Sequence, residues 1–394
     1  MKCSCRSSRN AWQLLKTTTT TRTHRSLPTL PKARPFSAQT DGGSNENERK
    51  VIFSGIQPTG VPHLGNYLGA MQQWKRMQDE ADANTKLIFS VVDLHAITVP
   101  REHGLLGPWK REMLAALLAI GLDPDRCVLF YQSTVPAHSE LQWILSCTAS
   151  TGYLSRMTQW KSKLSVSEDA DFMDNKVKKS LKHGLFSYPI LQAADILVHQ
   201  ATHVPVGDDQ RQHLEFAREC VVNFNTAYKG QHLVAPQSVF SPAKRVMSLQ
   251  NPAQKMSKSD PNARSRILIT DSVPEITKKI MSTKTDMTPT VSYDPATRPG
   301  VSNLLEILSH FDPRDRGAAE LAVSSDLAGA PLAELKKRVV DAVAGELVPI
   351  GQRFEEFMSR PGYLDKVVRQ GGERARESAE ATMRIVRAAV ELGP

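Results

Sequence analysis

The sequence has little cysteine and no long hydrophobic run. Only 5 of its 394 residues are cysteine, and no two of them form a C-x-x-C pair, which argues against a disulfide framework or a zinc site. Free thiols in a reducing compartment are therefore expected. No apolar run approaches the roughly 20 residues that span a bilayer, so we expect no membrane insertion. The longest, Met113–Ile120, is expected to be a buried helix that ends at Gly121.

The first forty residues contain no aspartate or glutamate, although eight of them are lysine or arginine. Without this segment the chain holds 42 basic and 41 acidic residues, so its net charge of +9 gives no argument for an RNA partner. A basic, Ser- and Thr-rich stretch with a short apolar patch is typical of mitochondrial transit peptides. We predict a disordered transit peptide over 1–40, a linker over 41–49 and a location in the mitochondrial matrix. A plain disordered tail is the alternative.

The body of the chain alternates apolar strands with helices. Strands are expected at Lys50–Ser54, Leu87–Val92 and Val128–Tyr131. Such alternation predicts βαβ units and a parallel sheet. The last 120 residues lack clear strands, and their apolar positions recur with helical spacing. The expected helices of the first part cover 65–76, 109–120, 140–150, 154–163 and 188–199.

These elements predict an α/β fold class with two domains. A Rossmann-type parallel-sheet nucleotide-binding domain is expected over 50–270, with a helical insertion at about 138–185. An all-α domain is expected over 271–394. Ligands of such sheets bind beyond the carboxyl ends of the strands, so functional residues are sought there.

A glycine-rich turn follows the first predicted strand directly. It reads Ser-Gly-Ile-Gln-Pro-Thr-Gly over 54–60 and continues with His-Leu-Gly-Asn-Tyr-Leu-Gly over 63–69. Backbone N–H groups at a helix N-terminus attract anions, and glycines let a flat ligand approach the backbone. The turn fits neither the P-loop nor the dinucleotide fingerprint. Many turns of this kind are only structural.

Lys-Met-Ser-Lys-Ser at 255–259 is the most specific motif of the chain. Its two lysines supply mobile positive charges for phosphate oxygens, and its serine hydroxyls can donate hydrogen bonds. A Lys- and Ser-rich loop without function is the alternative. Its position roughly 190 residues after the glycine-rich turn makes a chance match improbable.

The two motifs together resemble the His-Ile-Gly-His and Lys-Met-Ser-Lys-Ser signatures of class I aminoacyl-tRNA synthetases. Asn66 replaces the second histidine, and this Gly-Asn-Tyr form is typical of the tryptophanyl branch. For His63, a merely exposed turn histidine is the alternative. The resemblance runs from about Val51 to the C-terminus and is strongest over 51–100 and 185–262. It implies ATP binding by Gln57, Thr59, His63, Gly65, Asn66, Gly207, Asp209, Lys255, Met256, Ser257 and Lys258.

Segments 92–98 and 185–213 resemble the tryptophanyl group closely. Indole N–H can only donate, so a tryptophan pocket needs a buried acceptor. Asp195, set between Ala194 and Ile196, could supply it, with a surface helix carboxylate as the alternative. The resemblance implies that Tyr188, Gln210 and His95 hold the charged ends of tryptophan. The implied tryptophan pocket comprises Phe53, Gly55, His95, Tyr188, Gln192, Asp195, Val204, Val206 and Gln210.

The implied reaction is in-line attack of the tryptophan carboxylate on the α-phosphorus of ATP, followed by transfer to tRNA(Trp). The carboxylate is already ionised near neutral pH, so catalysis is positioning and charge stabilisation. Lys255 and Lys258 are expected to stabilise the triphosphate, assisted by Gln57 and by Lys163, with Lys161 as the fallback. No carboxylate cluster suggests a metal site built by the protein, so Mg²⁺ is expected to bind through the ATP phosphates.

The resemblance also implies a homodimer and an anticodon-reading C-terminal domain. From the residues alone, a solvated helix face is an equally good interpretation, because acidic residues interleave with the basic ones. Three other functions remain open: a tyrosyl-tRNA synthetase, another nucleotidyltransferase with a His-x-Gly-His turn, and a synthetase-derived non-catalytic RNA-binding or splicing protein. The basic residues of the C-terminal domain considered for anticodon reading are Arg353, Arg360, Lys366, Arg369, Arg374, Arg376, Arg384 and Arg387.

Overall fold

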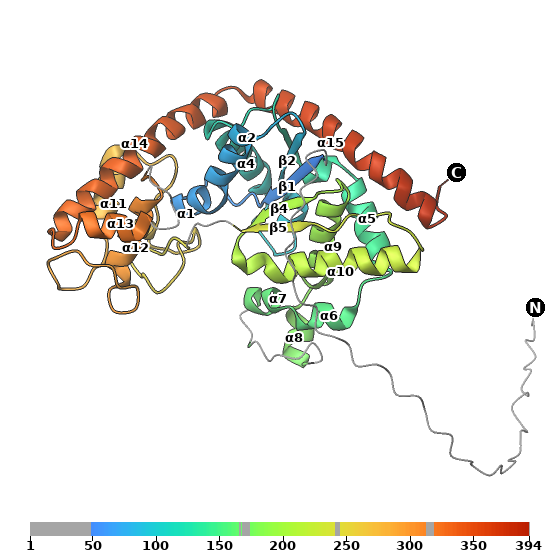
Figure 1. Cartoon of the computed structure of the whole chain (residues 1–394), viewed down its shortest axis with the longest axis horizontal. Coiled ribbons are helices and arrows are strands. Elements are labelled where there is room, and N and C mark those ends of the chain that lie inside the picture. Colours follow the sequence, from blue (N-terminus) through green and yellow to red (C-terminus); the bar gives the residue numbers. More distant parts are fainter. Residues whose placement is uncertain (1–48, 165–166, 168–173, 241–244, 313–318, 394) are drawn as a thin grey trace, which may run out of the picture. The chain divides into compact units, whose positions relative to one another are not determined.

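The computed structural model describes residues 49–164, 167, 174–240, 245–312 and 319–393. The predicted transit peptide and nearly all of the predicted linker lie outside the described residues. In the described chain, helices surround a five-stranded sheet (Figure 1). Within these ranges no helix has both the length and the apolar character needed to traverse a bilayer.

The sheet is parallel and has the strand order β3-β2-β1-β4-β5. The prediction missed two of its strands, β4 and β5; one of them includes a proline, which is unusual inside a sheet, and neither is a continuous apolar run like the equally short β3. The chain winds outward from β1 through β2 and β3 and then returns to place β4 on the other side of β1. This reversal creates a switch point beside β1. The strands are β1 (Lys50–Ile56), β2 (Thr85–Val91), β3 (Val128–Tyr131), β4 (His203–Val206) and β5 (Gln237–Phe240).

Side chains of the central strands alternate between two hydrophobic cores. On β2, Leu87 and Phe89 lie in one core and Ile88 lies in the other. On β3, Leu129 belongs to the first core and Phe130 to the second. Because successive side chains of a strand point to opposite faces, both faces of the sheet are covered, as expected for a doubly wound fold.

The helices mostly follow the sequence pattern, with differences at their ends. The predicted helix 154–163 is two helices, because the backbone at Met157 is extended while its side chain is buried. The predicted helix 140–150 starts at Ala137 and ends at Ser146. The first part of the chain contains α1 (Leu64–Asn66), the π-helical η1 (Tyr67–Met71), α2 (Gln72–Glu80), α3 (Asp93–Ala96), α4 (Leu106–Ala119), η2 (Gln132–Thr134), α5 (Ala137–Ser146), α6 (Thr151–Arg156), α7 (Thr158–Lys163), α8 (Asn175–Ser180), α9 (His183–Leu197), η3 (Asp208–Gln210) and α10 (Arg211–Ala227).

The buried helix expected at Met113–Ile120 is confirmed. It is the C-terminal part of α4, its side chains are buried, and the chain leaves it through Gly121 at a φ of 97°. Only glycine adopts that left-handed conformation without strain, which explains why the helix stops there.

After residue 271 the described residues form helices and no strand. The helix α14 packs against α4, α11 and α12, and α15 packs against β3 and α5 (Figure 1). The predicted fold class is therefore confirmed, whereas the predicted boundary at residue 270 stays a prediction. These elements are α11 (Val273–Met281), α12 (Pro299–Ser309), α13 (Ala319–Asp326), α14 (Leu332–Met358) and α15 (Pro361–Ala389), and the short η4 (Ala263–Ser265) precedes them.

The helix α15 runs along the open edge of β3. The guanidinium of Arg374 donates to the carbonyl oxygens of Pro124 and Cys127, at 2.6 and 3.1 Å. A Cβ atom added to Gly371 would lie 1.8 Å from the carbonyl oxygen of Leu129, so the helix touches the strand backbone itself. Covering an edge strand in this way prevents it from pairing with another chain.

Candidate active site

A cavity of about 280 Å³ opens at the carboxyl ends of β1 and β4, where the switch point predicts a ligand site. A Cβ at Gly55 would lie 2.7 Å from Cγ1 of Val92, so glycine is needed to keep the wall of the cavity close to β2. Every residue predicted to bind tryptophan lines this cavity, together with four of the predicted ATP or phosphate ligands. The lining residues from the prediction are Phe53, Gly55, Gln57, His95, Lys163, Tyr188, Gln192, Asp195, Val204, Val206, Gly207, Asp209 and Gln210.

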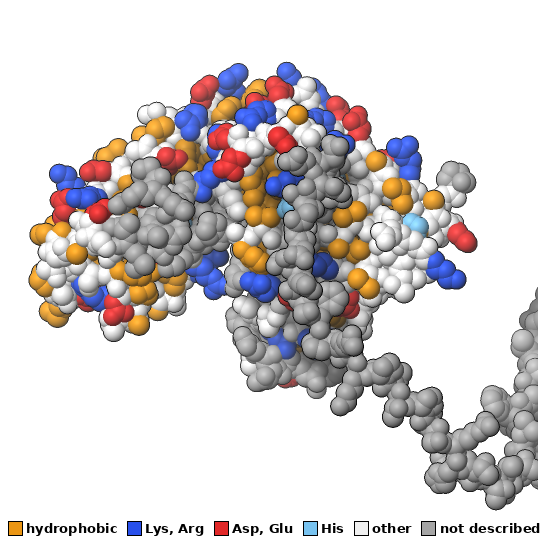
Figure 2. Space-filling view, in the orientation of Figure 1, with side chains coloured by type: hydrophobic (Ala, Val, Ile, Leu, Met, Phe, Trp, Pro, Cys, Tyr) orange, Lys and Arg blue, Asp and Glu red, His pale blue; other side chains and the backbone are white. Residues whose placement is uncertain are grey.

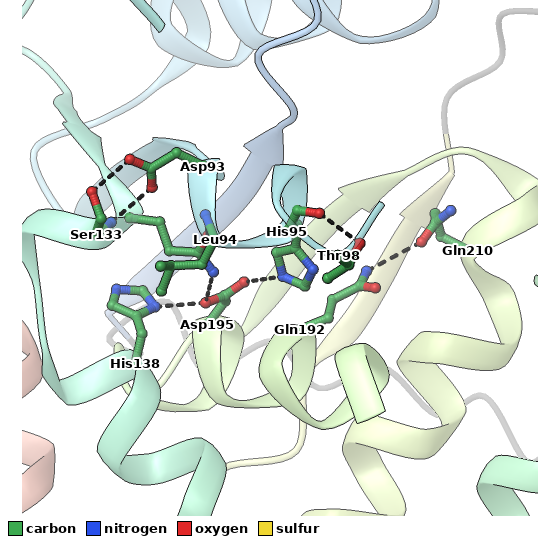
Figure 3. A network of polar contacts seen from close by, with 10 residues as sticks. Asp93, Leu94, His95, Thr98, Ser133, His138, Gln192, Asp195 and Gln210 are labelled. Atoms are coloured by element: carbon green, nitrogen blue, oxygen red, sulfur yellow. Dashed lines mark hydrogen bonds and ion pairs between the residues drawn. The ribbon is translucent and has the colours of Figure 1, made fainter. Parts of the chain in front are cut away.

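Asp195 on α9 is the most deeply buried charged group of the cavity, with 2% of its surface exposed. Its Oδ1 accepts hydrogen bonds from Gln132 Nε2 at 2.6 Å and from His138 Nδ1 at 2.7 Å. Its Oδ2 lies 2.8 Å from His95 Nε2 (Figure 3). The prediction that this carboxylate is buried is confirmed, and the alternative of an exposed carboxylate on a surface helix is wrong.

The charge of Asp195 is maintained despite its burial. Burial alone would raise the pKa of a carboxyl group, but the hydrogen bonds from His138 and His95 outweigh it and lower the pKa of Asp195 to about 2. The carboxylate is therefore ionised at neutral pH and can only accept hydrogen bonds.

The loops that follow β2 and β3 hold one another in place. Asp93 accepts hydrogen bonds from the N–H and the hydroxyl of Ser133 (Figure 3). Gln132 Oε1 accepts a hydrogen bond from the backbone N–H of Leu94 at 3.0 Å. This bond turns the side-chain nitrogen of Gln132 toward Asp195. This cross-link fixes which end of the Gln132 amide faces the cavity.

A second set of polar side chains lies beside this network, where the rings of His95 and Tyr188 are 6.0 Å apart. The hydroxyl of Tyr188 lies 2.9 Å from His213 Nε2 and 3.0 Å from Gln159 Oε1, and burial raises the pKa of this phenol. Gln192 donates to Gln210 at 3.2 Å. Lys163 Nζ lies 4.3 Å from the centre of the Tyr188 ring. Lys163 lines the cavity and Lys161 does not, which favours Lys163 over the fallback.

The two signature motifs meet outside that cavity. Lys258 Nζ donates to the hydroxyl of Thr59 at 3.1 Å and to the carbonyl of Gly60 at 2.7 Å. The backbone N–H of Leu64 donates to the carbonyl of Ile267 at 2.8 Å. Segments almost 200 residues apart in the sequence therefore form one side of the site.

His63 and Asn66 cap the first helical turn. The Asn66 N–H donates to His63 Nδ1 at 3.2 Å, and the Asn66 side chain accepts the His63 N–H at 3.1 Å. His63 is buried, so the exposed-turn alternative is wrong. Burial, followed by the charges of Lys258 and Lys255, lowers the pKa of His63 to about 3, and its ring is neutral at physiological pH.

The remaining residues of the second motif have different environments. Lys255 is exposed, whereas Met256 is buried and its N–H donates to the carbonyl of Val246. The hydroxyls of Ser257 and Ser259 lie 2.8 Å apart. Burial lowers the pKa of Lys258 to about 8, against an opposing effect of Glu112.

Four polar residues of the site were missed by the sequence analysis: Gln132, His138, Gln159 and His213. Gln132 directly follows β3 and so stands at the sheet edge where ligands bind, a signal that could have been used. His138 and Gln159 lie on helices outside both signature motifs, whereas His213 is the last residue of the segment 185–213 that resembles the tryptophanyl group. Only the folded chain brings these three residues to the site.

The described residues contain no group of three or more His, Cys, Asp or Glu side chains placed to hold a metal ion. The donor set of the site therefore does not fit a metal centre built by the protein alone.

The parallel sheet, the cavity at its switch point and the contact between the two motifs define a nucleotide-binding α/β protein. The model of the family described as tRNA synthetases class I (W and Y) matches residues 45–344. The chain belongs to this family.

Several of its relatives are tryptophan-specific by name. The mitochondrial tryptophan–tRNA ligases of Schizosaccharomyces pombe and Saccharomyces cerevisiae are 43% and 45% identical to the chain, and each alignment covers 84% of it and 92% or 87% of the relative. A solved tryptophanyl-tRNA synthetase from Mycoplasma pneumoniae has a TM-score of 0.75 at 32% identity, covering 88% of this chain and 98% of that one. The Campylobacter jejuni enzyme complexed with ADP and tryptophan has a TM-score of 0.68 at 29% identity, covering 87% and 100%.

Proposed function

We infer that the protein is a tryptophan–tRNA ligase that activates tryptophan with ATP and transfers it to tRNA(Trp). The observation that carries this conclusion is Asp195, a buried, ionised acceptor at the wall of a cavity large enough for an amino acid side chain. Indole N–H is a donor without acceptor capacity, so a carboxylate is its complement. Relatives named tryptophan–tRNA ligase are 43% and 45% identical to this chain over the aligned residues.

In the proposed complex the indole lies between the apolar residues Phe53, Val204 and Val206 of β1 and β4. Tyr188 and Gln210 hold the charged ends of the amino acid. His95 was expected to share that task, but its Nε2 is bonded to Asp195. We propose that His95 acts mainly on the indole side of the pocket.

The proposed ATP site lies between the two motifs, with Gln57, Gly207 and Asp209 reaching it from the cavity. Class I synthetases use ATP, and Mg²⁺ would be bound through its phosphates. Lys258 has backbone and hydroxyl partners at Thr59 and Gly60, so binding the triphosphate requires it to exchange these contacts for phosphate oxygens. Lys255, which is exposed, and Lys163 would complete the positive charge around the leaving pyrophosphate.

The C-terminal helices are proposed to read the tRNA anticodon, over 271–394. Half of the basic residues considered for this role contact the α/β body instead: Arg353, Arg374 and Arg376 donate to backbone carbonyls, and Arg387 pairs with Glu140. Lysines, arginines and acids interleave along the visible outer surface (Figure 2). Lys366, Arg369 and Arg384 are exposed and are the better candidates for phosphate contacts.

A homodimer is proposed from an apolar groove of about 510 Å³ between α5 and α9. Trp143 and Ile97 line it with 69% and 63% of their surfaces exposed, which is unusual for such side chains in a monomer. A second copy of the chain is the proposed occupant. Trp143→Glu should give a monomer in sedimentation experiments, whereas Val222→Glu, an exposed apolar position on α10, should leave the dimer intact. A dimeric Trp143→Glu protein would contradict the assignment.

The proposed location is the mitochondrial matrix, reached through a transit peptide over residues 1–40. Two relatives are mitochondrial by name. The acid-free, basic composition of this segment supports the proposal.

Amino-acid-dependent ATP–pyrophosphate exchange, measured across all twenty amino acids with protein lacking residues 1–43, tests the proposed function. Exchange with tryptophan alone is expected. Exchange with tyrosine would keep the fold and reassign the pocket. Absence of exchange in folded protein that binds ATP would instead support a synthetase-derived RNA-binding protein.

A further inference from the structure

The hydrogen bonds around Asp195 distinguish its two oxygens. Each carboxylate oxygen offers two acceptor positions. Oδ1 already accepts from Gln132 and His138, so both of its positions are used. Oδ2 accepts only from His95 among the described residues, which leaves one position for a ligand. The indole N–H of tryptophan must therefore donate to Oδ2.

His138 is built into the wall behind that carboxylate. It lies in the first turn of α5, none of its surface is exposed, and its ring packs 5.7 Å from Phe130 and 5.2 Å from His199. Its Nε2 has no hydrogen-bond partner in the described chain. A proton on Nε2 would be buried without an acceptor, so the single ring proton belongs on Nδ1, where it donates to Asp195.

The position of α5 is fixed by a contact with α15. Both carboxylate oxygens of Glu140, one half-turn after His138, accept hydrogen bonds from the guanidinium of Arg387 on α15, at 2.6 and 2.7 Å. A bidentate arginine–carboxylate pair of this kind restrains the orientation of the two side chains as well as the distance between them. The side chain of His138 therefore has little freedom to follow Asp195 if the carboxylate turns.

We propose that His138 is a positioning residue for substrate specificity: by holding Oδ1 of Asp195, it presents the remaining acceptor position of Oδ2 to the indole N–H. The inference rests on the proposed tryptophan specificity. Without His138, Oδ1 would keep only its hydrogen bond from Gln132, so the carboxylate would be held by two partners instead of three and would turn more freely about its χ2 angle. The indole N–H would then meet a carboxylate of variable orientation.

The test compares two substrates that differ only at the hydrogen-bond donor. Tryptophan carries an N–H, and β-(benzothiophen-3-yl)alanine has sulfur in its place. Their kcat/KM values are measured by ATP–pyrophosphate exchange with wild-type protein and with His138→Leu. The variant should reduce the preference for tryptophan about ten-fold or more, because it weakens a bond that only tryptophan makes.

Two further variants separate positioning from packing. His138→Asn places an amide nitrogen where Nδ1 stands and should retain the wild-type preference, whereas His138→Gln moves that donor one atom further out and should lose it. This pair keeps the test informative if His138→Leu does not fold. His199→Leu removes the neighbouring buried imidazole, which has no hydrogen bond to Asp195, and should affect both substrates equally.

Equal losses for both substrates in His138→Leu or His138→Gln would overturn the proposal, because His138 would then serve packing alone. Unchanged kcat/KM values for both substrates in these variants would overturn it as well, because His138 would then have no effect on the reaction. Failure of the proposed function looks different: the wild-type protein itself would activate no tryptophan, and the inference would fall with it.

Discussion

The contact between α15 and the edge of β3 leads to a sharp stability prediction. In Gly371→Ala, the new Cβ would lie 1.8 Å from the carbonyl oxygen and 2.7 Å from the carbonyl carbon of Leu129. Ordinary carbon–oxygen contacts are about 3.3 Å or more, so the helix must move outward by roughly 1.5 Å. Both partners are backbone, and neither can turn aside as a flexible side chain would.

The magnitude follows from what that movement disrupts. Overpacking of a tight interface costs about 1–3 kcal/mol. The two hydrogen bonds from Arg374 to β3-flanking carbonyls would lengthen, at about 1 kcal/mol each, while the better helix propensity of alanine returns about 1 kcal/mol. Gly371→Ala should therefore lower the free energy of unfolding by about 2–4 kcal/mol.

Urea unfolding followed by circular dichroism measures the effect, with Gly345→Ala as the matched control. Gly345 is exposed in the middle of α14, and a Cβ there would meet no described atom within 4 Å. Alanine at this position should stabilise the protein by up to about 1 kcal/mol. If Gly371→Ala were as stable as the wild type, the close contact between α15 and β3 would be refuted.

Three further predictions concern activity and import. Lys258→Ala should slow adenylate formation far more than it weakens tryptophan binding, measured by single-turnover kinetics and calorimetry; an unchanged rate would remove Lys258 from the mechanism. Because Lys258 has a pKa of about 8 and is charged only below it, kcat/KM for ATP should fall as the pH rises through 8. Lys258→Arg, which stays charged, should lose that fall, and a fall that persists would assign it to another group. Deleting residues 1–40 should preserve exchange activity but abolish import into isolated mitochondria, and normal import would discredit the transit peptide.

Local patterns were sufficient to predict the first three strands and both signature motifs. The strand at Val128–Tyr131 was predicted at its exact bounds, because a short apolar run between turn residues has few other interpretations. The strands β4 and β5 were missed because their pairing partners, rather than their own residues, make them strands. Their register is fixed only by pairing with β1 and with each other.

The polar network at the cavity shows a second limit. Asp195 was predicted as a buried acceptor from its apolar neighbours in the sequence. The groups that bind it are 57 to 100 residues away in the chain, on three different elements. No spacing rule connects them, since their proximity depends on how α5, α3 and η2 meet α9.

The placement of α15 also has a consequence for how the chain is made. The strand β3 is complete at residue 131, but the helix that covers its edge ends at residue 389. At roughly 5–20 residues per second, synthesis of the intervening chain takes on the order of tens of seconds. Throughout that interval the nascent polypeptide carries an uncovered strand edge, which is a template for aggregation. Its dependence on chaperones should therefore persist throughout that interval, and should disappear once α15 has docked.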